Sequence, residues 1–164
     1  MVRIILLVFL CVGMASCKEK EPELLSSETS TYYISTENWP KKTTVNTKAQ
    51  EILADWSEYQ EFDTNFDALY NVANRDDLSL TVEDLIEKQI ALEASEYPET
   101  FNKPQVKSRQ RVFKTYMLKV KGDLFYRTDP RESVVEMIEA YNAFRNQFNV
   151  ITNNPLDTDL ILEE

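Results

Sequence analysis

The stretch TDPRESVVEMIEAYNAFRNQFNV, residues 128–150, carries the clearest helix signal in the chain. Asp129 suits the N-cap position, Pro130 suits the first helical position, and Glu132 completes a capping box. Behind them, apolar side chains return every three or four residues, at Val134, Met137, Ile138, Tyr141, Phe144 and Phe148. Because this spacing puts them on one helix face, the stretch predicts an amphipathic helix over residues 129–150.

The same spacing predicts three earlier helices, over residues 46–75, 81–97 and 103–127. The polar stretch NRDDLSL, residues 74–80, is expected to break the chain between the first two. Thr81 and Asp84 resemble a capping box for the second helix. Pro98 ends that helix, because the residue before a proline disfavours helical geometry.

No segment shows the sustained alternation of a β-strand. Four amphipathic helices joined by short loops therefore predict an all-α fold, an antiparallel up-down four-helix bundle over residues 46–151. Residues 152–164 form an acidic C-terminal tail.

Residues 17–45 have no helical period and are rich in serine, threonine and charge, which predicts a flexible tether. Four large side chains are unusual for a free linker, namely Tyr32, Tyr33, Ile34 and Trp39. Either this part packs back on the bundle and buries them, or it is a partner-binding segment.

The N-terminus has the features of an export signal. Arg3 precedes an apolar run over residues 4–12, which is long enough for a signal peptide but too short to span a bilayer. Small residues follow, then Cys17, and then the charged sequence KEKEPE.

Residues Met14, Ala15, Ser16 and Cys17 resemble the lipobox of bacterial lipoproteins. The resemblance implies a signal peptide over residues 1–16, cleavage between Ser16 and Cys17, and diacylglycerol on the Cys17 thiol. It also implies a lipid-anchored protein of the cell envelope, at the outer membrane, on either its periplasmic or its outer face. The KEKEPE sequence resembles the export signal of surface lipoproteins in the Bacteroidetes group. The alternatives are a plain signal peptide or a buried N-terminal helix.

Composition excludes several classes of function. The chain has no histidine, and its two cysteines are Cys11 and Cys17, so sites that need these residues in the folded part are excluded, such as Cys/His zinc sites, His-ligated haem and Ser-His-Asp catalysis. Gly122 is the only glycine after the signal peptide, which excludes a glycine-rich phosphate loop. We therefore expect no cofactor, no metal site, no catalytic residue and no enzymatic activity. The net charge of −10 also argues against nucleic acid as a partner.

Basic side chains concentrate on the predicted helix 103–127, where one group could form an anion- or partner-binding face: Lys107, Arg109, Arg111 and Lys114. The alternative is that this helix lies between acidic helices and forms exposed ion pairs with them. Arg109 lies near the edge of the apolar stripe and could be partly buried against a carboxylate.

These observations favour a lipid-anchored binding or interaction module, with the bilayer as one partner and a protein or small molecule as another. The alternative is a carrier or sensor of a small apolar ligand held in a cavity between the helices. An enzyme that uses only carboxylates and tyrosine is a third hypothesis. The aromatic side chains of the first helix are expected to form core: Trp56, Tyr59, Phe62 and Phe66.

Overall fold

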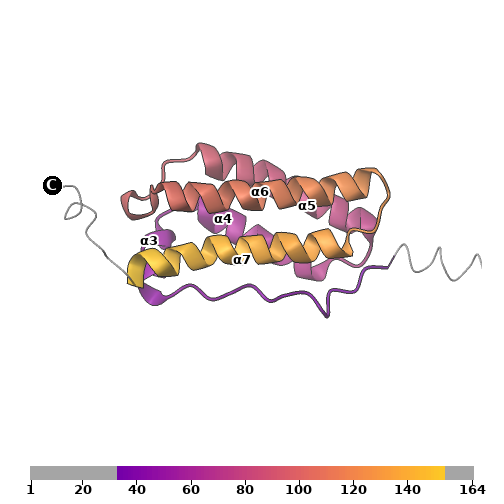
Figure 1. Cartoon of the computed structure of the whole chain (residues 1–164), viewed down its shortest axis with the longest axis horizontal. Coiled ribbons are helices and arrows are strands. Elements are labelled where there is room, and N and C mark those ends of the chain that lie inside the picture. Colours follow the sequence, from indigo (N-terminus) through magenta and orange to yellow (C-terminus); the bar gives the residue numbers. More distant parts are fainter. Residues whose placement is uncertain (1–32, 154–164) are drawn as a thin grey trace, which may run out of the picture. The chain divides into compact units, whose positions relative to one another are not determined.

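The computed structural model describes residues 33–153. Within them the chain forms five α-helices, α3 (Thr47–Ala54), α4 (Ser57–Phe66), α5 (Arg75–Ala94), α6 (Pro104–Phe125) and α7 (Arg131–Asn153), shown in Figure 1. Two 3-10 turns, η1 (Asp67–Asn71) and η2 (Glu99–Phe101), join them. The prediction of an all-α fold is confirmed for this part of the chain. The predicted signal peptide, Ser16 and Cys17, the first part of the predicted tether and most of the acidic tail lie outside the described residues.

The last two helices lie close to their predicted ranges. α6 begins at Pro104 and α7 at Arg131, where the Pro130 carbonyl accepts a 2.9 Å hydrogen bond from the Val134 amide. The Asp129 carboxylate accepts from the Arg131 amide at 3.1 Å, which provides an N-terminal cap. α7 continues to Asn153, so it takes in the first two residues assigned to the tail.

The predicted helix over residues 46–75 is three separate segments, α3, α4 and η1. The break lies at Trp56, whose ψ angle of 88° is not helical. The Gln60 side chain donates to the Leu53 carbonyl at 2.9 Å and so satisfies a backbone group at the end of α3. Apolar spacing could not reveal this break, because Trp56 is buried in the turn and continues the apolar stripe.

The start of α5 also corrects the prediction, because the NRDDLSL stretch opens this helix instead of separating two helices. The Asn74 side chain accepts from the Asp77 amide at 2.9 Å, and the Asp77 carboxylate accepts from the Ala73 amide at 3.3 Å. These two residues form a reciprocal cap, so the helix begins at Arg75 and Thr81 lies inside it.

Before α3, the extended segment of residues 33–45, here named the strap, runs along α7 (Figure 1). Asn142 accepts from the Thr43 amide at 2.8 Å and donates to the Lys41 carbonyl at 2.9 Å. Asn149, two turns later, accepts from the Asn46 amide at 2.7 Å. Ile34 and Trp39 of the strap are buried against the bundle, whereas Tyr33 is 69% exposed and Tyr32 lies outside the described residues.

Aromatic side chains fill the centre of the helical assembly. α4 packs on α5, α5 on α6, and α6 on α7, with α6 and α7 running in opposite directions (Figure 1). Phe62, Phe66, Phe113 and Tyr141 are fully buried, and the ring centroids of Phe66 and Tyr141 lie 4.1 Å apart. Among residues 33–153, no helix has the length and apolar character needed to cross a membrane.

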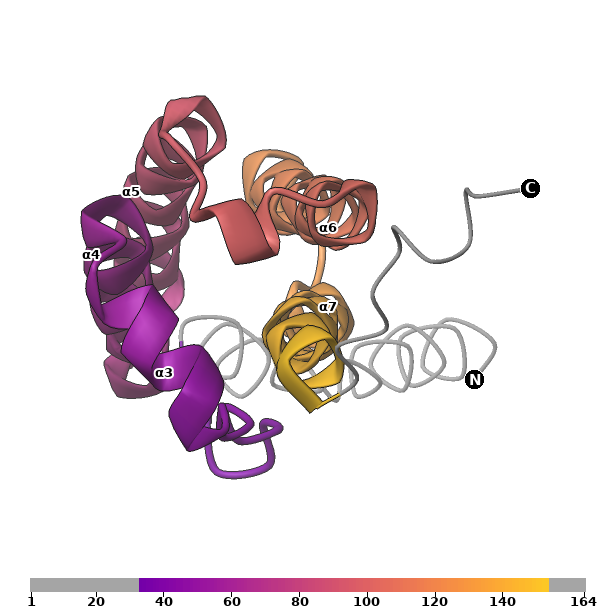
Figure 2. The same cartoon turned by 90° about the vertical axis from the view of Figure 1, so that its left-hand side faces the viewer.

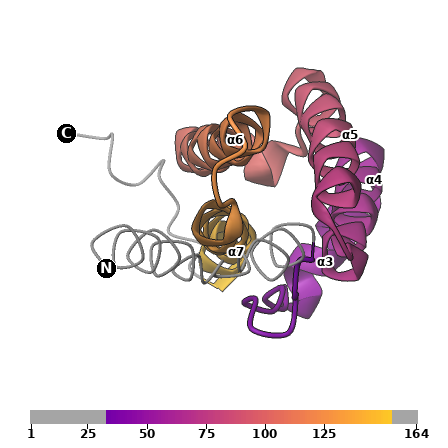
Figure 3. The ribbon, with the colours of Figure 1, turned by 90° about the vertical axis from the view of Figure 1, so that its right-hand side faces the viewer.

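The helices have two ends, which we name separately. At the distal end, η2 contacts α7 and the Asn46 side chain donates to that of Asn153 at 3.2 Å, and Figure 2 views the helices from this side. At the proximal end, the start of the strap, Asn74 with Arg75, and the α6–α7 turn lie together, and Figure 3 views them from that side. Two hydrogen bonds fix the proximal group. The Ile34 amide donates to the Ala73 carbonyl at 3.1 Å, and the Arg75 guanidinium donates to the Asp123 carbonyl at 2.8 Å.

Candidate binding hollow and a buried polar cluster

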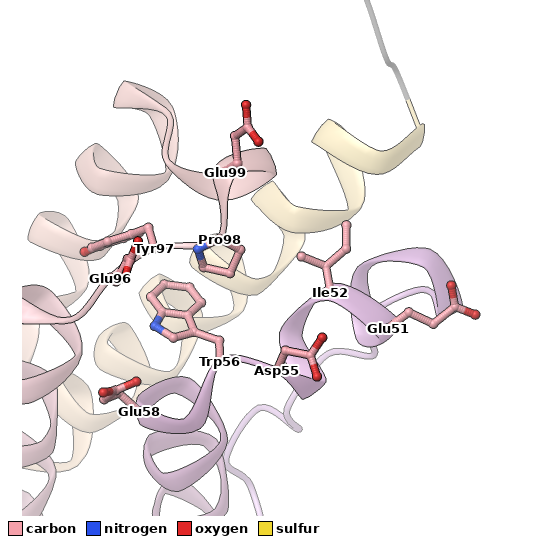
Figure 4. Close-up of a pocket in the computed structure, with 9 residues that line it drawn as sticks. All are labelled: Glu51, Ile52, Asp55, Trp56, Glu58, Glu96, Tyr97, Pro98 and Glu99. Carbon is pink, nitrogen blue, oxygen red and sulfur yellow. The ribbon is translucent and has the colours of Figure 1, made fainter.

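An open hollow of about 670 Å³ lies at the distal end, between the α3–α4 junction and the loop that follows α5 (Figure 4). Its lining, here named the acidic hollow, consists of Glu51, Ile52, Asp55, Trp56, Glu58, Glu96, Tyr97, Pro98 and Glu99. The break at Trp56 forms one wall, and the loop that follows α5, residues 96–99, forms the other.

The acidic hollow carries five carboxylates and no basic side chain. Among the ion pairs formed within residues 33–153, none involves these five carboxylates. Their negative charge is therefore not neutralised by the protein at this place. The hollow thus favours a positively charged occupant.

The apolar part of the acidic hollow is held in place by aromatic contacts. The Trp56 and Tyr97 ring centroids are 4.8 Å apart, and the Trp56 indole donates to the Ser95 hydroxyl at 2.8 Å. In the part of the chain that the structure describes, no three acidic side chains converge as metal ligands would. Carboxylates beside aromatic surface are instead suited to an organic cation such as a lysine or arginine side chain.

A second hollow of about 300 Å³ lies on the other side of Tyr97. Lys107, Gln110 and Arg111 of α6 line it, and the Lys107 ammonium lies 4.9 Å from the centroid of the Tyr97 ring. The Tyr97 hydroxyl donates to the Gln110 side chain. Burial raises the pKa of this hydroxyl, so it remains a neutral donor at ordinary pH.

Three of the four basic residues predicted as one face lie at or beside the second hollow, since Glu93, the partner of Lys114, also lines it. Lys107 and Arg111 line the second hollow, whereas Lys114 pairs with Glu93 of α5 at 2.5 Å. Lys119 pairs with Glu136 of α7 at 2.5 Å, so cross-helix ion pairs are present as the alternative interpretation expected. Arg109 is exposed, so the alternative in which it is partly buried against a carboxylate is not realised.

The buried arginine is Arg145 of α7, which sequence reasoning missed. It pairs with Asp63 of α4, donates to the Tyr59 hydroxyl at 3.0 Å, and donates to the Thr43 carbonyl of the strap at 2.9 Å. The Tyr141 hydroxyl donates to the same Asp63 carboxylate at 2.5 Å. The sequence did contain a signal, because Arg145 stands one turn after Tyr141 and next to Phe144, within the apolar stripe of α7.

This cluster joins α4, α7 and the strap, and Lys42 extends it to the surface. The Lys42 ammonium contacts Asp63 at 3.2 Å and Asp67 at 2.7 Å. Burial raises the pKa values of the Tyr59 and Tyr141 hydroxyls well above the ordinary value, so both remain protonated and neutral. Since each charge in the cluster faces an opposite charge, its evident role is to hold the strap in place.

Comparison with known proteins gives no match, whether with protein-family models, with curated protein sequences or with solved structures.

Proposed function

We propose that this protein is a lipid-anchored binding module of the bacterial cell envelope whose acidic hollow receives a positively charged segment of a protein partner. Cys17 carries the lipid and holds the chain to the outer membrane. The fold is proposed to be an antiparallel up-down four-helix bundle in which α3, α4 and η1 together take the first helical position. The proposal includes no catalytic step.

One observation carries the proposed partner chemistry, namely the five unpaired carboxylates around Trp56 and Tyr97. Grouping like charges in one hollow disfavours the empty state, and a bound ammonium or guanidinium group would relieve that repulsion. The half-buried Tyr97 ring offers surface for the methylene stem of a lysine or arginine side chain.

The alternative, a carrier of a small apolar ligand, has less support. The positions between α4, α6 and α7 hold Phe62, Phe113 and Tyr141, whose rings lie within 5.6 Å of one another. An apolar ligand would have to displace these side chains from contact, which costs buried apolar area.

Lipid attachment is tested in cells that express the full chain. An alkyne-tagged fatty acid should label the wild-type protein and should not label a Cys17→Ala variant. A wild-type chain that takes up no label would contradict the anchor.

Recognition by the acidic hollow is tested with a lysine decapeptide as the probe, in calorimetric titrations at low and at physiological salt. The test variant combines Glu51→Gln, Glu96→Gln and Glu99→Gln. The control variant combines Glu83→Gln, Glu87→Gln and Glu139→Gln, which lie on exposed positions of α5 and α7. Both variants have the same net charge.

We expect the hollow variant to weaken binding at least about tenfold and the control variant less than about threefold, since only close charges act strongly in salt. Equal losses in the two variants would show that net charge, and not the hollow, attracts the peptide.

A further inference from the structure

Two aromatic side chains at the proximal end have no place in the core. Phe125 is 78% exposed and Tyr126 is 76% exposed, and their ring centroids lie 5.1 Å apart in an edge-to-face arrangement. Tyr33, at the same end, is 69% exposed. Large aromatic residues this exposed are costly in water and are often part of a contact surface.

The residue after the pair has an unusual backbone conformation. Arg127 has a φ angle of 57°, in the left-handed region that glycine adopts without cost. The Thr128 amide donates to the Asp123 carbonyl at 2.9 Å and the Arg127 amide to the Leu124 carbonyl at 3.3 Å, so α6 ends in a Schellman motif. Glycine is the usual residue at this position, yet the chain places Gly122 inside α6 and an exposed arginine at the turn.

From this arrangement we propose that the proximal end docks on the lipid bilayer, with Phe125 and Tyr126 in the headgroup region and Arg127 at the lipid phosphates. Aromatic side chains with an adjacent arginine are typical of the membrane–water interface. The inference rests on the proposed lipid anchor at Cys17.

The position of the anchor in the chain identifies the bilayer as the occupant. Sixteen peptide bonds separate Cys17 from Tyr33, and a fully extended chain of this length spans at most about 55 Å. Tyr33 belongs to the proximal end, because it forms a β-bridge with Asn74. The next residue, Arg75, donates from its side chain to the Thr128 carbonyl in the α6–α7 turn. The lipid would therefore hold the aromatic pair near the bilayer at a millimolar effective concentration, at which the weak partitioning of two aromatic side chains suffices.

Docking in this way would also set the orientation of the acidic hollow relative to the membrane. α6 has 22 residues and is about 33 Å long, and the hollow lies at the end away from Phe125. The proposed partner site would then point away from the membrane.

The test uses the lipidated mature protein reconstituted in vesicles of phosphatidylethanolamine and phosphatidylglycerol. Because Cys17 would be acylated, Tyr126→Cys introduces a single free thiol, which is labelled with an environment-sensitive fluorophore. Thr100→Cys, on exposed η2 at the distal end, is the matched control. A third labelling site is needed when the aromatic pair is removed by Phe125→Ser and Tyr126→Ser, because residue 126 can then no longer carry the label. Lys121→Cys, also at the proximal end, provides that site.

We expect the label at residue 126 to shift to shorter wavelength and to be quenched several-fold more by brominated lipid than the label at residue 100. The two serine substitutions should abolish quenching at residue 121. If vesicles float with the protein but neither label is quenched, or both are quenched equally, the docking inference is wrong and the anchor stands. If the protein does not float with the vesicles, the anchor fails and the inference fails with it.

Discussion

At the scale of single residues, Arg145 and Asp63 decide how the strap and two helices meet. The Arg145 side chain is only 9% exposed, and its positive charge is balanced by the carboxylate of Asp63, whose side chain is 23% exposed. Removing one partner of such a pair leaves an uncompensated charge, which costs far more than the intact pair contributes.

We therefore predict that Asp63→Ala lowers the free energy of unfolding by about 2–4 kcal/mol, measured by urea denaturation. Asp67→Ala is the matched control, because Asp67 shares the contact with Lys42 but is exposed. The control should cost less than about 1 kcal/mol. Similar losses in the two variants would mean that Arg145 does not depend on Asp63.

The two buried tyrosines of this cluster predict the response to alkali. Burial, the main cause, raises the pKa of both Tyr59 and Tyr141 above the unfolded value of about 10. Above pH 10 the unfolded chain releases these protons while the folded chain keeps them, so stability falls as pH rises. The slope should reach about 1.4 kcal/mol per pH unit for each tyrosine.

Urea denaturation between pH 9 and pH 11 measures this slope. Tyr59→Phe removes one of the two tyrosines, so the slope should become shallower by about 1.4 kcal/mol per pH unit. An unchanged slope in Tyr59→Phe would contradict the prediction.

At the scale of elements, α6 and α7 could be predicted from the sequence because a proline stands at the start of each and their apolar spacing continues from it. The region of residues 46–80 could not, for two different physical reasons. Trp56 keeps the helical spacing while its backbone leaves the helix, and Asn74 with Asp77 forms a cap inside a stretch whose polarity indicates a loop. Spacing reports which side chains are buried, and it does not report whether the backbone between them is continuous.

The strap shows a related limit. An extended segment held by side chains has no period of its own, so only the buried Ile34 and Trp39 pointed to it. Its contacts come from the polar face of α7, where the asparagines at residues 142 and 149 lie two turns apart. Arg145 lies between them and was hidden within the apolar stripe of the same helix.

We predict that Asn142→Ala with Asn149→Ala loosens the strap without unfolding the helices. Limited trypsin digestion should then cleave after Lys41 and Lys42 several-fold faster, while the helical circular dichroism signal stays the same. Asn146→Ala is the control on the same helix, because Asn146 is exposed and makes no hydrogen bond to the strap. Equal cleavage rates in all variants would mean that these asparagines do not hold the strap.

At the scale of the whole described part, the two ends of the helices differ in chemistry. The distal end gathers unpaired carboxylates around Trp56, and the proximal end exposes Phe125, Tyr126 and an arginine. The sequence predicted neither site. The acidic hollow combines residues 51–58 with residues 96–99, and the exposure of Phe125 and Tyr126 depends on where α6 ends against the rest of the fold. Lipid attachment at Cys17 stays a prediction from the sequence alone, where a processing signal is read as a short contiguous stretch.

The strap also determines how the fold would bear a mechanical load. It runs from the proximal to the distal end in the same direction as α7, and Asn142, Arg145 and Asn149 bind it at successive turns. A pull on the N-terminal side of Tyr33 acts along the strap and shears it against α7. These bonds then share the force and must break together, whereas a perpendicular pull would break them one by one. The fold therefore resists tension best along the direction in which an anchored chain would be pulled.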